Sequence, residues 1–493
     1  MQPTERQKLK QFAGHSVIYG LGDALYKGIA FFLLPVYMRY LSPADYGVLE
    51  TLLVTREICI ALLSMGIPVA FLKYYYDNSE SCQRLSFVST SFWSYILFQL
   101  PIPVILIVFN SSLSNLIFKT EQYAVCFSIL AVNITLIAFR KIPLTLYRAR
   151  NMAIKYSVIT FLVAVFTLLF NIYFVVVAKK GVEGILWGNF MGGLTGVILV
   201  LLDVKAHVSF RINTSLLKKM LRYGFPLSLS TILLSFVFIN DRYFLAYFST
   251  LDELGKYALG SKFSSLMMVF FITPFLLNWV PFISANQKEP NKERLYSTVG
   301  ATFFYLGVNM VFFISVFAPL VITLIAPDAF GRAYTVIPML AYAILLYGIG
   351  FVFRSGILIS DNTNAITKIV VSGLAVNIGL NFTIIPLYGM HGAAISMLAS
   401  FMLMACYSYY ESQKKLAVEY PFIKMTVITC FSILFIVFYY IIFPTIERYL
   451  IKLVIALFFS VIFISVNHLT GIIDIKSIFS AIKNRSIVNM LKR

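Results

Sequence analysis

The chain has 493 residues, of which 59% are hydrophobic and only 12% are charged. Soluble domains carry roughly 25% charged residues, so this composition excludes an ordinary soluble protein and indicates an integral membrane protein. The formal net charge of +19 does not indicate a nucleic-acid partner, because lysine and arginine concentrate in the segments expected to be cytoplasmic, as membrane topology requires.

Apolar runs of about 20 residues recur along the chain, and each is long enough to cross roughly 30 Å of hydrocarbon. The sequence therefore predicts an all-α polytopic membrane protein with about 14 transmembrane helices and with both termini in the cytoplasm. The first span is expected to be retained, since no small-x-small cleavage site follows the basic N-terminus. The predicted spans are residues 12–40, 46–73, 85–109, 122–147, 155–178, 182–203, 223–248, 255–283, 295–325, 333–358, 365–387, 389–411, 424–444 and 449–467.

Several predicted spans carry charged side chains. The first span reads YGLGDALYKGIAFFLLPVYMRYL and places Asp23 and Lys27 one turn apart. The second span holds Arg56 and Glu57, and the eighth holds Lys262. A charge at the centre of a span costs about 2.5 to 3.5 kcal/mol, so these side chains are expected to line a hydrated cavity or to pair. The possible pairs are Asp23 with Lys27, and Glu57 with Arg56 or Lys262.

The seventh span carries a polar stripe of Ser228, Thr231, Ser235 and Arg242 at positions i, i+3, i+7 and i+14. An alternative for Arg242, which lies near the external end, is that its long side chain reaches the membrane surface. Cations outnumber acids among the internal charges, which favours an anionic substrate group such as a phosphate. We predict cavity cations at Lys27, Arg56, Lys262 and Arg242, carboxylates for ion coupling or pairing at Asp23, Glu57 and Asp241, and further polar cavity residues at Ser228, Thr231 and Ser235.

Cysteine and histidine residues are few and scattered. The five cysteines show no ligand spacing, and the four histidines form no cluster. The sequence therefore predicts no disulfide, no metal site and no cofactor.

The chain resembles itself at an offset of about 208 residues. In KKGVEGILWGNFMGG, Gly181 and Gly184 match Gly389 and Gly392 of PLYGMHGAAISMLAS. The segments RYLSPADYG and YFSTLDELG have nearly the same offset, as do two prolines of the second and eighth spans. Small residues at every fourth position after each Gly-x-x-Gly predict close helix packing; these residues are Gly188, Gly192 and Gly196 in one copy, and Ser396 and Ser400 in the other.

The offset predicts two parallel six-helix halves with a central cavity between them, followed by two further helices. The predicted parts are a first half at 1–204, a basic cytoplasmic linker at 205–222, a second half at 223–412, and two extra helices with a basic tail at 413–493. This organisation is typical of a transporter that works by alternating access.

Three segments are similar to one protein family. They are LPVYMRYLSPADYGVLE near the start, NDRYFLAYFSTLDELGKYAL (Asn240 to Leu259) and VNIGLNFTIIPLYGMHGAAISM (Val376 to Met397). They resemble the lipid-linked oligosaccharide flippases, that is, the O-antigen or polysaccharide repeat-unit flippases. Their superfamily also contains the multidrug and toxin extrusion antiporters and the lipid II flippase.

The resemblance implies a multi-pass protein of the bacterial inner membrane that moves an undecaprenyl-pyrophosphate-linked oligosaccharide from the cytoplasmic to the periplasmic leaflet. Related flippases carry functional cations in the helices that hold Lys27, Arg56 and Lys262 here. Antiporter relatives use a carboxylate of the first helix, which makes Asp23 a candidate for coupling to a proton or Na⁺. Membrane lipids, a polysaccharide polymerase and the chain-length machinery are the further expected partners.

Two other functions stay open at this point. A multidrug or cation antiporter of the same superfamily should favour carboxylates in its cavity. A membrane-embedded polysaccharide enzyme should present catalytic residues on a sizeable external loop, and no predicted external loop exceeds about a dozen residues. We therefore expect a transporter and not an enzyme.

We predict that Asp23→Asn impairs transport more than it impairs substrate binding, because the amide cannot take up or release a proton. Transport into inverted vesicles, measured with and without an ion gradient, checks this. If the variant depends on the gradient as the original chain does, Asp23 has no coupling role.

Overall fold

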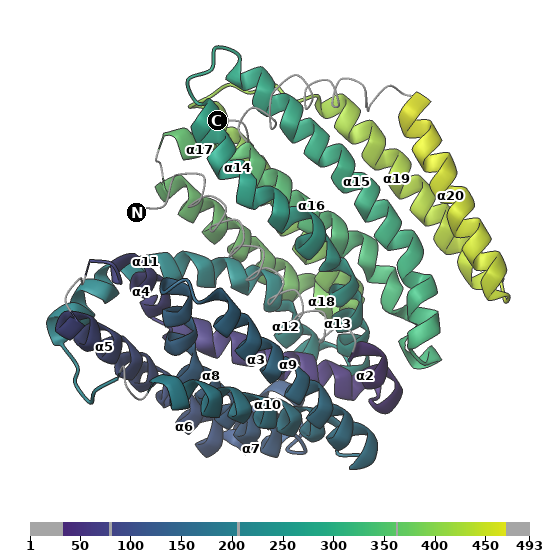
Figure 1. Ribbon diagram of the computed structural model, residues 1–493. Coiled ribbons are helices and arrows are strands. Elements are labelled where there is room, and N and C mark those ends of the chain that lie inside the picture. The colour runs from purple at the N-terminus through teal and green to yellow at the C-terminus, as the bar shows by residue number, and fades with distance from the viewer. Residues whose placement is uncertain (1–32, 78–80, 205–207, 361–362, 470–493) are drawn as a thin grey trace. The chain divides into compact units, whose positions relative to one another are not determined.

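The computed structural model describes residues 33–77, 81–204, 208–360 and 363–469, and every regular element within these ranges is a helix (Figure 1). Ten of these helices are long and apolar enough to cross a membrane, or up to eleven when a bent pair is taken as one span. The all-α multi-span class is therefore confirmed, while the number fourteen stays a prediction. Asp23 and Lys27 lie outside the described residues.

By spatial contacts the chain divides into two compact units. The first ends at Ala258 and includes Ile325–Ala329, and the second begins at Leu259. The predicted halves rest on sequence correspondence instead, so they stay a prediction. The first unit contains α2 (Leu34–Tyr40), α3 (Pro43–Leu63), α4 (Ile67–Tyr74), α5 (Ser81–Gln99), α6 (Pro101–Val108), α7 (Asn110–Phe118), α8 (Ala124–Ala149), α9 (Ala153–Ile172), the π-helix η1 (Tyr173–Val177), α10 (Gly181–Val204), α11 (Thr214–Ile239), α12 (Asp241–Phe248) and the start of α13 (Leu251–Ser264).

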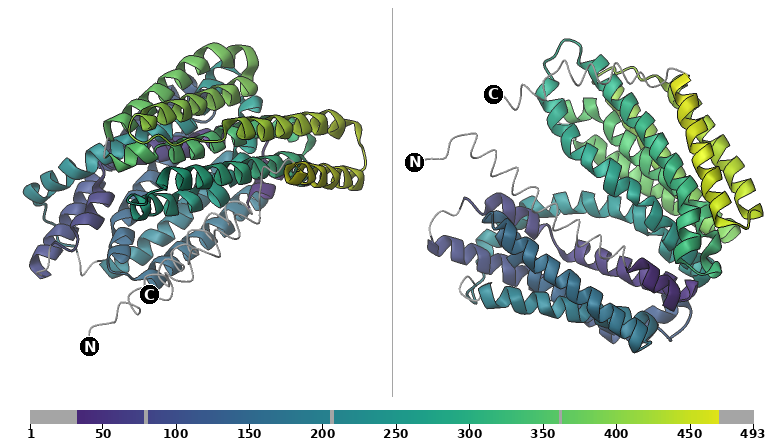
Figure 2. Two further views of the ribbon diagram at one scale, coloured as in Figure 1. Left: turned by 90° about the horizontal axis from the view of Figure 1, so that it is seen from above. Right: turned by 45° about the vertical axis from the view of Figure 1, so that its right-hand side comes forward.

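The second unit continues from α13 to the end of the described chain. Its elements are η3 (Met268–Ile272), α14 (Thr273–Asn286), α15 (Lys292–Ile325), most of η4 (Asp328–Val336), α16 (Ile337–Phe353), α17 (Ser355–Ile359), α18 (Thr363–Gln413), α19 (Phe422–Ile442), η5 (Phe443–Thr445) and α20 (Tyr449–Leu469). Helices α15, α19 and α20 lie side by side in both sets of views (Figures 1 and 2). Stacked rings of Phe312 and Phe463, with centroids 4.1 Å apart, join α15 to α20.

Glycines let α9 and α10 pack closely. Gly188, Gly192 and Gly196 of α10 face Asn171, Thr167 and Val163 of α9, and a Cβ atom at Gly196 would lie 2.6 Å from the Val163 side chain. Both series step by four residues, which keeps each on one face of its helix. In a membrane, where apolar helices gain little from leaving lipid, such close contact is a main source of helix association.

The second span is broken at Gly66. Helices α3 and α4 meet there at an angle of 51°, and Met65 and Gly66 both have positive φ values, 47° and 67°. A Cβ atom on Gly66 would overlap the backbone carbonyl of Gly224 in α11. Only glycine therefore fits the turn and the contact, and Pro68 follows in the first turn of α4, where its missing N–H costs nothing.

Helix α18 consists of two antiparallel arms. Its backbone leaves the helical region at Gly389, with φ 51° and ψ −127°. A Cβ atom on Gly392 would lie 2.6 Å from the Ile384 carbonyl oxygen, and further from the turn Gly373 packs on Met404. The arms correspond to the two predicted spans 365–387 and 389–411. Gly181, at the start of α10, has a similar φ of 54°.

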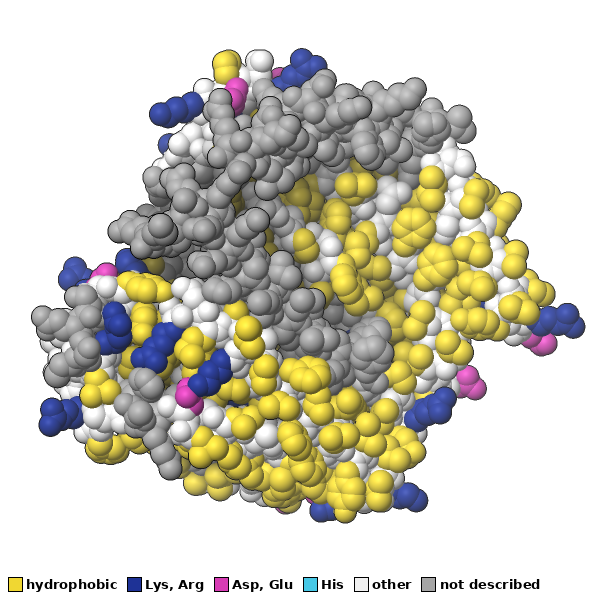
Figure 3. All heavy atoms as spheres, in the orientation of Figure 1, with side chains coloured by type: hydrophobic (Ala, Val, Ile, Leu, Met, Phe, Trp, Pro, Cys, Tyr) yellow, Lys and Arg dark blue, Asp and Glu magenta, His cyan; other side chains and the backbone are white. Residues whose placement is uncertain are grey.

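Hydrophobic side chains cover much of the described surface, as a lipid-facing protein requires (Figure 3). On α20, for example, Leu450, Val454 and Val461 are exposed. Lys and Arg side chains gather at the left of the same view, over α4, α5 and α11. These findings describe a multi-span membrane protein.

We predict that Gly192→Ala lowers the midpoint of thermal unfolding in detergent by several degrees. The new methyl group would overlap the Thr167 side chain and would lie 2.9 Å from its Cα, and overpacking of this kind typically costs about 1 to 3 kcal/mol. The matched control is Gly379→Ala in α18, where no heavy atom lies within 4 Å. Equal midpoints for the two variants would contradict the packing argument.

Candidate functional site

Two helix starts, those of α3 and α13, form the frame of the candidate site. Ser42 caps α3 by accepting a hydrogen bond from the Asp45 N–H at 3.1 Å, and Pro43 occupies the first turn. Thr250 accepts a hydrogen bond from the Glu253 N–H at 3.2 Å, next to the first turn of α13. A hydroxyl followed three residues later by an acid is a common signal for a helix start.

The two helices touch through their backbones at Gly47 and Gly255. A Cβ atom on Gly47 would lie 2.7 Å from the Leu251 carbonyl oxygen and 2.8 Å from the Gly255 nitrogen. A Cβ atom on Gly255 would overlap the Pro43 carbonyl. The two glycines come from the matching segments RYLSPADYG and YFSTLDELG, so the crossing joins residues that correspond in the predicted repeat.

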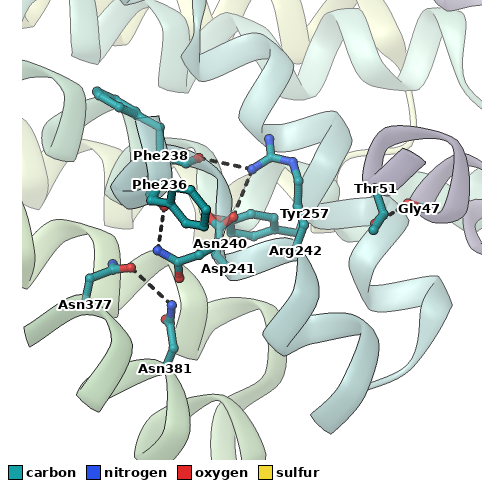
Figure 4. A network of polar contacts seen from close by, with 10 residues as sticks. All are labelled: Gly47, Thr51, Phe236, Phe238, Asn240, Asp241, Arg242, Tyr257, Asn377 and Asn381. Atoms are coloured by element: carbon teal, nitrogen blue, oxygen red, sulfur yellow. Dashed lines mark hydrogen bonds and ion pairs between the residues drawn. The ribbon is translucent and has the colours of Figure 1, made fainter. Parts of the chain in front are cut away.

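A buried polar cluster lies beside this crossing; we call Tyr46, Glu50, Asp241, Arg242 and Tyr257 the Arg242 cluster. Arg242 Nη1 donates to Asp241 Oδ1 at 2.9 Å and to the Phe238 carbonyl at 3.2 Å (Figure 4). The Tyr257 hydroxyl donates to the other Asp241 oxygen. Asp241 and Arg242 are only 1% and 7% exposed. Both side chains therefore lie inside the described part of the protein and are paired with each other.

Helix α3 supplies the other part of the Arg242 cluster. The Tyr46 hydroxyl donates to Glu50 Oε1 at 3.2 Å, and both residues are buried. Glu50 is close enough to interact electrostatically with Arg242. The Arg242 cluster thus brings two carboxylates to one guanidinium: Glu50 comes from α3, Asp241 and Arg242 come from α12, and Tyr257 comes from α13. Buried charges need partners of this kind.

Threonines continue the polar contact between α3 and α12. Thr55 Oγ1 lies 2.8 Å from the Tyr243 hydroxyl and also donates to the Thr51 carbonyl. Thr51 in turn donates to the Gly47 carbonyl at 2.9 Å. The residues Gly47, Thr51 and Thr55 form one face of α3, and this face is directed at α12 and α13.

The predicted cations Arg56 and Lys262 have different surroundings from Arg242. Arg56 Nη2 pairs with Glu57 Oε1 at 3.0 Å, which is one of the pairings considered from the sequence. The Arg56 side chain is 19% exposed and that of Glu57 is 64% exposed. Lys262, in α13 and in the second unit, is exposed. These side chains are accessible although they lie within long apolar helices.

The predicted polar stripe spans α11 and α12. Ser228, Thr231 and Ser235 lie in α11 and Arg242 lies in α12, and Asn240 between the two helices keeps helical φ and ψ values of −68° and −26°. Ser228 and Ser235 donate to backbone carbonyls of their own helix, those of Phe225 and Thr231. Such bonds leave the serine oxygens able to accept a further hydrogen bond.

The second unit buries two polar residues of the quoted VNIGLN segment. Asn381 Nδ2 donates to Asn377 Oδ1 at 3.3 Å, one turn earlier on the first arm of α18 (Figure 4). Both side chains are fully buried. Buried amides without charge suit a structural role between helix arms.

Sequence reasoning missed Tyr46, Glu50 and Tyr257 as site residues. One signal was present: Tyr46 and Glu50 are four residues apart, hence on one helix face, at the start of an apolar run. Tyr257 gave no comparable signal, because its importance comes from its contact with Asp241, 16 residues earlier in the chain.

The chemistry available at the Arg242 cluster is ion pairing and hydrogen bonding. Its hydroxyl groups are phenolic, and each is bonded to a carboxylate. Within the described ranges, no group of three or more His, Cys, Asp or Glu side chains could hold a metal ion. The arrangement is suited to holding helices together and to exchanging charge partners.

Comparison with known proteins adds the following. A family model described as "Polysaccharide biosynthesis protein" matches residues 36–335. No curated protein sequence matches the chain. Among solved structures, the lipid II flippase MurJ in an inward closed conformation is similar with a TM-score of 0.73 at 14% identity, over 93% of this chain and 100% of that one.

A second solved structure with a similar fold is an inward-facing multidrug resistance transporter of the MATE family, which belongs to the MOP superfamily. Its TM-score is 0.66 at 16% identity, over 79% of this chain and 94% of that one. At these identities the likeness concerns the fold alone, and it is the fold of flippases and transporters.

We predict that Arg242→Gln destabilises the protein by about 3 kcal/mol or more, because it leaves the Asp241 carboxylate buried without its charge partner. The double variant Asp241→Asn with Arg242→Gln should recover part of this loss, since it removes both charges. Thermal unfolding of the two single variants and the double variant in detergent measures the coupling. Additive losses would show that the ion pair contributes no coupling energy.

Proposed function

Because the chain belongs to the polysaccharide biosynthesis protein family, we propose that it is a flippase for an undecaprenyl-pyrophosphate-linked oligosaccharide. In this proposal it moves an O-antigen or similar repeat unit from the cytoplasmic to the periplasmic leaflet of the bacterial inner membrane, coupled to a proton or Na⁺. The observation that carries the proposal is the family match over residues 36–335, the part of the chain that holds Arg56, Arg242 and Lys262.

The depth of two cations supports an anionic substrate group. Arg56 is 13 residues beyond the first residue of α3, and Lys262 is 11 beyond that of α13. At 1.5 Å per residue these positions lie roughly 20 Å and 17 Å along their helices, near mid-depth of a hydrocarbon layer about 30 Å thick. Accessible cations at that depth cannot face acyl chains at low cost, and a pyrophosphate is a suitable partner for them.

The Arg242 cluster has a separate role in this proposal. It holds the starts of α3, α12 and α13 together at the end expected to be external, next to the crossing at Gly47 and Gly255. Alternating access then requires these contacts to loosen when the external side opens. In this proposal Arg242 exchanges Asp241 for Glu50, the second carboxylate of the cluster.

A multidrug antiporter is the alternative within the same fold. It differs from the proposed flippase in the charge of its substrate, and the accessible cations Arg56 and Lys262 favour an anion. Deletion of the gene distinguishes the two functions. A flippase defect should leave lipid-linked repeat units on the cytoplasmic leaflet, whereas an antiporter defect should raise drug sensitivity without that accumulation.

We predict that Arg56→Ala and Lys262→Ala each reduce the amount of surface polysaccharide at least tenfold at an unchanged protein level. Each loses a charged contact to the pyrophosphate, and hydrogen bonds to charged groups contribute about 1.5 to 3 kcal/mol. Complementation of the deletion strain, with membrane protein levels measured by immunoblot, checks this.

The matched control is Lys256→Ala, in α13 six residues before Lys262. It removes the same charge near the start of the same helix and should retain at least half of the original polysaccharide. Normal polysaccharide in the double variant Arg56→Ala with Lys262→Ala would refute the role of these cations.

A further inference from the structure

Basic side chains gather where the end of α4 meets the start of α11 in the first unit (Figure 3). The backbones of the two helices touch at Gly66 and Gly224, and Asp77 beyond the end of α4 meets Lys219, so the helices run antiparallel. Four exposed cations share this surface, and we call them the α4–α11 basic patch: Lys73 of α4, and Lys218, Lys219 and Arg222 of α11.

Two tyrosine rings organise the patch. Lys73 Nζ lies 3.6 Å from the centroid of the Tyr223 ring, and Lys219 Nζ lies 4.4 Å from that of the Tyr74 ring. The two rings meet edge to face with centroids 5.7 Å apart, and both pack against the hydrophobic core of the first unit. Each ammonium group is therefore positioned by a neutral ring, which attracts it without cancelling its charge.

The patch carries more positive charge than the described residues around it balance. Among the described side chains, Asp77 is the one carboxylate that pairs with it, at 3.6 Å from Lys219, and both side chains are more than half exposed. An exposed pair of this kind contributes little. Lys218 and Arg222 are four residues apart on α11, where like charges repel each other. An anion bound at the patch would therefore relieve repulsion and also gain contacts.

Exposed apolar side chains continue from the patch along both helices. Val69, one turn before Lys73, is 50% exposed, and Phe225 and Leu229, at i+3 and i+7 from Arg222, are 47% and 45% exposed. Residues at these spacings share one face of a helix. Because the helices are antiparallel, both series extend in the same direction from the patch. The surface therefore suits an anionic headgroup that is attached to a hydrocarbon chain.

The charge of the patch favours a pyrophosphate over a single phosphodiester. Four cations face one exposed carboxylate. A lipid-linked pyrophosphate has a negative charge on each of its two phosphates, whereas an ordinary acidic phospholipid has a single charged phosphodiester. Arginine binds phosphate oxygens through two parallel hydrogen bonds, and lysine adds a point charge.

We propose that the α4–α11 basic patch is the docking site for the pyrophosphate headgroup of the lipid-linked substrate, with its hydrocarbon chain along Val69 and Phe225. This inference rests on the proposed function and adds a place where the substrate binds before translocation. The patch lies on the side expected to be cytoplasmic. Membrane orientation requires basic residues on that side, but it does not require two ammonium groups to lie on adjoining rings.

Native mass spectrometry of the full-length protein in detergent tests the proposal. The probes, each titrated separately, are undecaprenyl pyrophosphate, dioleoyl phosphatidylglycerol and inorganic pyrophosphate. We expect undecaprenyl pyrophosphate to bind roughly tenfold more tightly than phosphatidylglycerol, because hydrogen bonds to one further charged group contribute about that factor. Inorganic pyrophosphate, which lacks the chain, should bind more weakly. Equal affinity for phosphatidylglycerol would overturn the proposed function together with the docking site, and equal affinity for inorganic pyrophosphate would overturn the lipid.

Variants test the docking site by itself. They are made in the chain that carries Arg56→Ala and Lys262→Ala, so that binding by those two cations does not mask a loss at the patch. Lys73→Gln with Arg222→Gln should lower the affinity for undecaprenyl pyrophosphate roughly 20-fold, since each basic residue near an anionic headgroup contributes about fivefold.

The matched control is Lys288→Gln with Arg294→Gln, which removes one exposed lysine and one exposed arginine from the second unit. Equal affinities of this variant and of Lys73→Gln with Arg222→Gln would overturn the docking site. That outcome would leave the proposed function standing, provided that the original chain binds undecaprenyl pyrophosphate more tightly than phosphatidylglycerol.

Tyr223 separates an organised site from unspecific attraction of charges. Tyr223→Phe keeps the ring beside Lys73 and should bind undecaprenyl pyrophosphate as tightly as the chain with Tyr223 does. Tyr223→Leu keeps all four cations and should bind it several-fold more weakly. Equal affinities of the two variants would show that the ring does not position Lys73 and would contradict the proposal.

Discussion

The backbone contact between α3 and α13 at Gly47 and Gly255 is the constraint from which the candidate site follows. Two helices can approach this closely only where neither has a Cβ atom, and in lipid such close packing is a main force that holds helices together. The contact fixes the rotation of both helices. Tyr46 and Glu50 on one side and Tyr257 on the other are thereby turned toward Asp241 and Arg242. The contact between Gly47 and Gly255 thus determines which side chains surround the buried Arg242.

The charged pairs within the apolar helices differ in how deeply they are buried. Asp241 and Arg242 are buried and bonded to each other. Separating them therefore costs much free energy, and their geometry is specific. Arg56 and Glu57 are paired as well, but they remain accessible. An accessible pair can exchange its partner for a substrate group at lower cost than a buried pair. This difference in burial is the physical reason why the proposed function uses Arg56 for substrate contact and Arg242 for joining helices.

Local hydropathy predicted the helices well, because apolar runs are a property of neighbouring residues. The span expected at 122–147 is α8, Ala124–Ala149, and that expected at 424–444 is α19, Phe422–Ile442. The break at Gly66 was not predicted, because it depends on the backbone of Gly224 in α11, which packs against it. Asp241 was identified as a site residue from its charge, and Arg242 from its charge and its place in the polar stripe. Their partners Glu50 and Tyr257 required the crossing of α3 and α13, which no local pattern contains.

The turn at Gly389 has a consequence for how the protein is made. Its two arms are separated by a single non-helical residue, so no hydrophilic loop has to be carried across the bilayer before the second arm can follow the first. During synthesis the arms are therefore suited to enter the membrane as one hairpin, already paired through Gly392 and Gly373. The hairpin then enters the lipid with the contact between Gly392 and Ile384 already formed.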